Sequence, residues 1–122
     1  MGLDMYAYAR AAAPAAPVDF PQEEGDQEIA YWRKHPNLHG WMERLYRQKG
    51  GQGEDFNCDN LVLTTADLDQ LEADLKANTL PHTTGFFFGQ SRPDEQALDL
   101  AFIEKARAAI AEGKTVYYSS WW

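Results

Sequence analysis

The chain has 122 residues, of which 44% are hydrophobic and 25% charged, and its formal net charge is −8 at pH 7. This length fits one domain with one buried core, so two full domains and a disordered chain are both excluded. The negative charge argues against a protein that binds nucleic acid or an anionic membrane surface through bulk charge.

Cysteine usage and hydropathy indicate the compartment. A single cysteine, Cys58, cannot form an intrachain disulfide, and no Cys or His lies near it at the spacing of a metal motif. No apolar run approaches the roughly 20 residues needed to span a bilayer, and residues 1–10 lack the features of a secretory signal. We therefore expect a cytoplasmic protein with no membrane contact, in which Cys58 is a small buried residue.

The first half of the chain predicts two strands and a helix. Residues 2–10 alternate between apolar and polar, as in a half-buried strand, and residues 11–27 form an Ala/Pro-rich and then acidic surface loop. Alternation resumes at residues 28–34, where Pro36 disfavours a helical conformation at the preceding residue. Pro36 suits the first position of a helix, and an apolar stripe follows it at Leu38, Trp41, Met42 and Leu45.

The second half predicts three strands and two helices. A short strand over residues 61–63 precedes a helix that Thr64 caps together with Asp67. The apolar run 85–89 reads as a central strand. Ser91 and Pro93 begin the longest helix, whose apolar stripe includes Leu98 and which Gly113 closes, and residues 115–122 form a last strand.

These elements define an α+β fold. The chain, residues 1–122, is expected to be a single domain with an antiparallel or mixed sheet of about five strands and about three helices packed on one face.

Four blocks occur along the whole length: G-L-D-M-Y at residues 2–6, Y-W-R-K-H-x-x-L-H-x-W at 31–41, G-F-F-F-G at 85–89 and Y-Y-x-S-W at 117–121. Together they resemble a family of small uncharacterised proteins of bacteriophages, prophages and bacteria. The resemblance implies a context and no activity. The chain departs from the family pattern at Pro36, where a polar residue is expected, and in an Ala/Pro extension at residues 11–17.

His35 and His39 are the strongest candidates for a metal or catalytic site, because neutral imidazoles are common metal ligands. His39 lies at the edge of the predicted apolar stripe and His35 precedes the helix, so the two rings need not converge. No Glu follows His35 as in HExxH, and further ligands would have to come from elsewhere, for example His82. A divalent metal is therefore one reading, and two histidines bonded to backbone or water are the other. No further cofactor is expected.

Two carboxylates and the serines complete the candidates. Asp4 shares a strand face with Tyr6 and needs a partner, which Arg33 or Lys34 could supply as a structural pair or as part of a site. Asp99 falls within the apolar arc of the longest helix and is interpreted as a rim residue with a basic partner. No G-x-S-x-G motif occurs, so the sequence does not support a serine hydrolase.

Aromatic residues are concentrated in the predicted strands. Placed on a sheet face that no helix covers, they would form a partner surface, and in a small protein the commonest partner is a second copy. The alternative is that the rings complete the core. The predicted interface residues are Tyr8, Tyr118, Trp121 and Trp122.

The sequence thus favours a non-enzymatic binding or interaction module of phage or bacterial origin that self-associates as a dimer, with a protein partner as a further possibility and nucleic acid disfavoured. The alternative is a small metal- or ligand-binding enzyme. Its candidate ligand-binding residues are Asp4, Tyr6, His35, His39 and His82.

Overall fold

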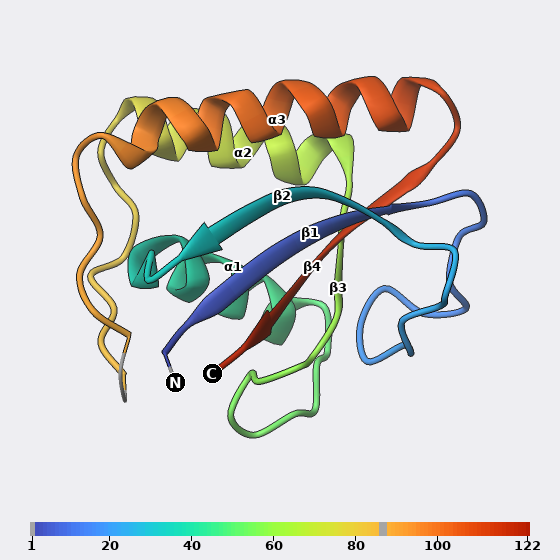
Figure 1. Cartoon of the computed structure of the whole chain (residues 1–122), viewed down its shortest axis with the longest axis horizontal. Helices are drawn as coiled ribbons and strands as arrows, with labels where there is room; N and C mark the ends of the chain where they lie inside the picture. The colour runs from blue at the N-terminus through green and yellow to red at the C-terminus, as the bar shows by residue number, and fades with distance from the viewer. Residues whose placement is uncertain (1, 86–87) are drawn as a thin grey trace.

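The computed structural model describes residues 2–85 and 88–122. The described residues form one antiparallel sheet of four strands in the order β2-β1-β4-β3, together with three helices (Figure 1). The elements, in chain order, are β1 (Asp4–Arg10), β2 (Gln27–Arg33), α1 (Pro36–Gln48), β3 (Leu61–Leu63), α2 (Thr65–Lys76), α3 (Glu95–Ala111) and β4 (Thr115–Trp121).

The α+β class, the antiparallel sheet and the three helices agree with the prediction, whereas the strand count is one lower among the described residues. The expected central strand at 85–89 includes Phe86 and Phe87, which lie outside the described residues. On either side of them, Gly85 and Phe88 belong to no strand, and the Phe88 amide donates to the Gly85 carbonyl at 3.2 Å.

The alternating pattern of β1 separates the two faces of the sheet. Met5 and Ala7 are fully buried and face the helices, where Met5 lies opposite Trp32 of β2 and Ser120 of β4. Tyr6 and its alternate neighbours point to the other face, which is called the open face below. A bulge between Ala7 and Tyr8 shifts the register with β2.

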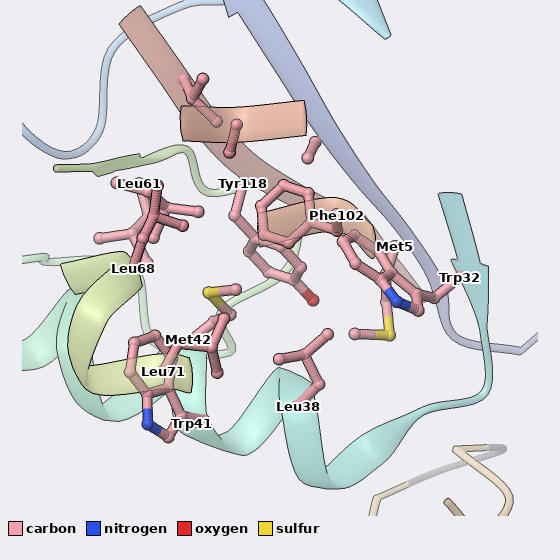
Figure 2. Close-up of a cluster of buried hydrophobic side chains, with 14 of the residues drawn as sticks. Met5, Trp32, Leu38, Trp41, Met42, Leu61, Leu68, Leu71, Phe102 and Tyr118 are labelled. Atoms are coloured by element: carbon pink, nitrogen blue, oxygen red, sulfur yellow. The ribbon is translucent and has the colours of Figure 1, made fainter. Parts of the chain in front are cut away.

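The core lies between the sheet and the helices, as Figure 2 shows. Leu38 and Met42 of α1 are fully buried, as the apolar stripe predicts, and Trp41 is nearly so. In α2, the Thr64 hydroxyl accepts from the Asp67 amide and the Asp67 carboxylate accepts from the Thr64 amide, which confirms the predicted capping box.

The longest helix, α3, differs from its prediction in two respects. It begins at Glu95 rather than near Ser91, and Leu98, which was placed on the buried stripe, is 59% exposed. Phe102 and Ile103 carry the burial instead. Gly113 has φ +88°, as expected for the residue that closes the helix.

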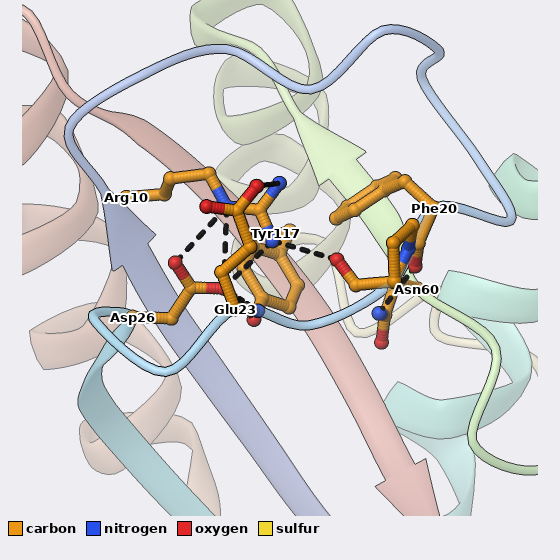
Figure 3. Close-up of polar contacts among 7 residues, drawn as sticks. Arg10, Phe20, Glu23, Asp26, Asn60 and Tyr117 are labelled. Carbon is orange, nitrogen blue, oxygen red and sulfur yellow. Dashed lines mark hydrogen bonds and ion pairs between the residues drawn. The ribbon is translucent and has the colours of Figure 1, made fainter.

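The loop over residues 11–26 folds back over one end of the open face (Figure 3). Val18 forms an isolated bridge with Leu61, and Phe20 packs edge-on against Tyr117. Arg10 is 5% exposed and its Nη2 donates to Asp26 at 2.7 Å and to the Pro21 carbonyl at 2.8 Å. The predicted surface loop is therefore anchored at several points.

The described part of the chain contains no helix that combines the length and the apolar character required to cross a bilayer.

Candidate functional site around His35

A cavity of about 480 Å³ lies between the start of α1, the end of α2 and the start of α3. Its volume is in the range of small-molecule sites, and its wall combines polar groups with an apolar portion. The lining residues are His35, Asn37, Leu75, Asn78, Leu80, Ser91, Arg92, Pro93, Gln96 and Asp99.

His35 joins this wall to the core. Its ring is almost completely buried, and Nε2 lies 2.8 Å from Oδ2 of Asp99. The other carboxylate oxygen of Asp99 accepts a hydrogen bond from the Trp32 indole at 2.9 Å. Asp99 is itself 1% exposed, and its two carboxylate oxygens are engaged by the Trp32 indole and by the His35 ring.

Ser91 occupies the opposite side of the imidazole. Its Oγ lies 2.7 Å from Nδ1 of His35 and accepts a hydrogen bond from the Asn37 amide at 3.0 Å. Because the backbone amide already donates to Oγ, the hydroxyl proton is available to Nδ1 when Nε2 carries the ring proton toward Asp99. Ser91, His35 and Asp99 thus form one hydrogen-bonded line.

Glu95 adds a second carboxylate to the same ring nitrogen. Its Oε2 lies 2.8 Å from Nδ1 of His35 as an ion-pair contact, while Oε1 accepts from Nε of Arg92 at 3.3 Å. Within residues 2–85 and 88–122, Oε2 is buried without a hydrogen bond of good geometry. This oxygen is therefore close enough to His35 to interact electrostatically with a charged ring, without forming a directed hydrogen bond to Nδ1.

Local sequence explains why His35 faces α3. Lys34 adopts φ +58°, which turns the chain sharply after β2, and Pro36 then begins α1. His35 is the N-cap residue, yet its side chain makes no capping bond. Instead of capping the backbone amides of α1, the ring contacts Asp99 and Glu95 of α3.

His39 does not share this site. It is 1% exposed, its Nδ1 lies 2.6 Å from the Tyr118 hydroxyl, and its ring packs against Phe56 and Phe88. His35 and His39 have no common side-chain partner in these contacts. In the part of the chain that the structure describes, no group of three or more His, Cys, Asp or Glu side chains is arranged to hold a metal ion.

The other predicted ligand-binding residues lie elsewhere. Asp4 is on the open face, where its Oδ1 accepts from the Tyr31 hydroxyl at 2.6 Å and from Arg33 at 2.8 Å. The expected Asp4 and Arg33 pair is therefore present. Tyr6 lies next to it and packs against Tyr31, and His82 is exposed in the loop after α2.

The predicted aromatic face is divided between the two sides of the sheet. Tyr8 is half-buried and stacks on Tyr117 on the open face, where Trp121 is 69% exposed. Tyr118 is fully buried on the helix side, so it takes the alternative role of completing the core. Trp122 is partly buried, and its indole donates to the Phe56 carbonyl at 3.1 Å.

Two further single-residue predictions, for Cys58 and Asp99, were wrong. Cys58 is exposed, because it occupies a turn with φ +61° after Phe56 has entered the core. Asp99 is buried and not at a rim, since its basic partner, His35, is itself inside the fold. Partial desolvation of the sulfur and the nearby Asp59 carboxylate raise the pKa of the Cys58 thiol, so it is not an activated thiolate.

The site also contains two residues that the sequence analysis did not select. Ser91, Glu95 and Asp99 recur every four positions; Glu95 and Asp99 lie on one side of the start of α3, and Ser91 lies in the segment before it. A search for polar residues at this spacing beside an apolar stripe would have found them. Their convergence on His35, more than 50 residues earlier, required the tertiary structure.

Comparison of the chain with protein-family models, with curated proteins and with solved structures gave no match.

The buried position of His39 leads to a prediction about pH. Burial lowers the pKa of His39 from 6.5 to about 4, so between these values the unfolded chain binds a proton that the folded chain does not. Stability should fall as the pH drops from about 6.5 toward 4, by roughly 2 to 3 kcal/mol from this residue. Urea denaturation at about pH 7.5 and pH 4.5 measures the loss. In the variant His39→Gln the loss should be smaller by that amount, and equal losses would contradict the assignment.

Proposed function

We propose that this chain is a small-molecule binding protein whose ligand occupies the cavity beside His35. The observation that carries the proposal is the line of Ser91, His35 and Asp99 along the wall of a cavity of about 480 Å³. Burial of ionisable groups is costly, and such groups gathered at a cavity are typical of binding and catalytic sites. The cavity thus replaces the residue set expected from sequence, of which only His35 contributes.

The lining indicates the chemistry of the ligand. Asn78, Arg92 and Gln96 place amide and guanidinium groups on the wall, and Leu75, Leu80 and Pro93 give an apolar portion. This combination suits a small molecule that has a carbonyl or carboxyl group on a short apolar body.

A fragment screen followed by two-dimensional amide NMR tests the proposal. Carbonyl- and carboxyl-containing fragments should shift the amides of Asn37, Asn78, Ser91 and Gln96 in the wild type. The variant Leu80→Trp, which places an indole in the cavity, should abolish these shifts. A library in which no member shifts these amides, or in which all shifts fall on the open face, would contradict the proposal.

A second function, self-association through the open face, is supported by a separate observation. Tyr31 and Trp121 are 48% and 69% exposed on the same side of the sheet. Trp121 also lines a groove of about 460 Å³, together with Tyr6 and Tyr8. Exposed aromatic residues are enriched at the centres of protein interfaces, and isologous pairing of two copies would bury both sets at once.

Sedimentation velocity over a range of concentrations tests self-association. The wild type should form dimers at high micromolar concentration, and the double variant Tyr31→Ser/Trp121→Ser should be monomeric. Leu98→Ser is the matched control, because Leu98 is also an exposed hydrophobic residue but lies on α3, and it should leave the dimer intact. A wild type that stays monomeric would refute the second function.

We also propose a phage or bacterial origin and a cytoplasmic location for this binding protein. The block at residues 31–41, which resembles the phage and bacterial family, supplies Trp32 and His35 to the site. An exposed single thiol, Cys58, suits a reducing cytoplasm, where it would not be oxidised. The thiol supports a cytoplasmic location, and the four sequence blocks support a phage or bacterial origin.

A further inference from the structure

The geometry points to Ser91 as a nucleophile that attacks short acyl esters bound in the cavity, with His35 as its general base. This inference rests on the proposed function, because the ester would be the ligand of the His35 cavity. It goes beyond binding, since it assigns a covalent reaction to the site. No sequence motif indicates such chemistry, and the tertiary contacts alone support it.

The first support is the geometry between nucleophile and base. Ser91 Oγ and His35 Nδ1 are 2.7 Å apart, which is the distance at which a hydroxyl transfers its proton to an imidazole. Nε2 of His35 faces Asp99 at 2.8 Å, so Asp99 holds the ring in the tautomer whose Nδ1 accepts a proton. The Trp32 indole donates to the other carboxylate oxygen of Asp99 and holds it in place. Asp99 is therefore a positioning residue, which acts through His35.

The second support is the buried oxygen of Glu95. Beside a neutral ring, Oε2 of Glu95 has no hydrogen-bond donor, and its contact with Nδ1 is unfavourable. Once Nδ1 takes the Ser91 proton, the imidazolium lies between Glu95 at 2.8 Å and Asp99 at 2.8 Å. The surroundings therefore favour the charge that develops during attack over the ground state.

The reaction balances with the ester and water as its only reactants. Ser91 Oγ bonds to the carbonyl carbon while its proton passes to Nδ1 of His35. The bond from that carbon to the alcohol oxygen then breaks, and the alcohol leaves with the proton from Nδ1. Water hydrolyses the acyl-serine by the same route in reverse. Asn78 and Arg92, on the same wall, are the candidate donors to the oxyanion; Arg92 uses Nε for Glu95 and keeps its terminal guanidinium nitrogens for this role.

A short-chain alkyl fluorophosphonate is a direct probe of this assignment. Ser91 Oγ should bond to its phosphorus, with fluoride leaving and the proton passing to His35. Intact mass measurement should show one adduct in the wild type, and peptide mapping should place it on Ser91. Ser91→Ala should lose the adduct while remaining folded, with a melting temperature lowered only by the loss of the hydrogen bonds that Oγ makes. Ser119→Ala, which removes a serine on the open face, should label at the wild-type rate.

The role of Glu95 has its own readout, the pH profile of labelling. Removing the carboxylate charge in Glu95→Gln destabilises the imidazolium, so the acid limb of the profile should move to lower pH. An unchanged acid limb would refute this role. Absence of an adduct on Ser91, or an adduct elsewhere, would overturn the nucleophile assignment. If fragments still shift the cavity amides in that case, the proposed binding function stands and only the chemistry fails. If neither occurs, both fail.

Discussion

Replacing Asp99 with alanine is expected to lower the free energy of unfolding by about 3 to 5 kcal/mol. Asp99 is 1% exposed and holds both the Trp32 indole and Nε2 of His35. Without the carboxylate, two buried donors lose their acceptor, and Glu95 is the one remaining carboxylate in contact with the His35 ring in the described structure. Urea denaturation monitored by tryptophan fluorescence measures the change.

Asp94 provides the matched control for this prediction. It is the same residue type at the start of the same helix, but it is exposed and makes no capping bond. Asp94→Ala should change the free energy of unfolding by no more than about 0.5 kcal/mol. Similar effects for the two variants would show that the His35 network does not organise this part of the fold.

Replacing Arg10 with alanine should cost about 3 kcal/mol, because it leaves the Asp26 carboxylate buried without its cation. The side chains of Arg10 and Asp26 are 5% and 2% exposed, and Tyr117 also donates to Asp26 at 2.6 Å (Figure 3). Arg33→Ala is the control, since the pair of Arg33 with Asp4 is much more exposed and its loss should lower the free energy of unfolding far less. Equal losses in the two variants would contradict the anchoring role of Arg10.

The same pair also determines how the protein responds to acid. The Arg10 guanidinium lowers the pKa of Asp26 from 3.8 to about 2, so this carboxylate stabilises the fold above pH 3.8 and loses that effect as the pH falls through about 2. In Arg10→Ala the stability should depend less on pH in this window. An unchanged dependence would show that other carboxylates dominate acid unfolding.

Local sequence patterns predicted the regular elements well. The alternation in β1 and the stripe of α1 each report one buried face, and the Thr64 capping box is a short-range contact that sequence spacing specifies. The errors arose where tertiary contacts decide. Leu98 sits on a turn of α3 that no neighbour covers, and periodicity alone does not show where a packing partner ends.

The candidate site was predictable only in part. The chemistry of an imidazole identifies His35 as a candidate from sequence alone, and its spacing along the chain favours a pair with His39. In the structure the two rings diverge, His39 toward Tyr118 and His35 toward Asp99. The partners of His35 come from a helix more than 50 residues later, and no local pattern specifies which side chains of two distant elements meet.

The two proposed surfaces are on opposite sides of the sheet. The His35 cavity lies among the helices, whereas Tyr31 and Trp121 are on the open face. Variants on one side should therefore leave the property of the other side unchanged. Self-association and ligand binding can be measured independently in the same set of proteins.

The most direct measurement of the central claim is the long-range ¹H–¹⁵N spectrum of the histidine side chains at about pH 8. The line of Ser91, His35 and Asp99 predicts a His35 ring that is protonated at Nε2 and accepts a hydrogen bond at Nδ1, with the Nδ1 resonance shifting in Ser91→Ala and on addition of a cavity-binding fragment. A His35 spectrum that responds to neither change, or a ring protonated at Nδ1 alone, would contradict it.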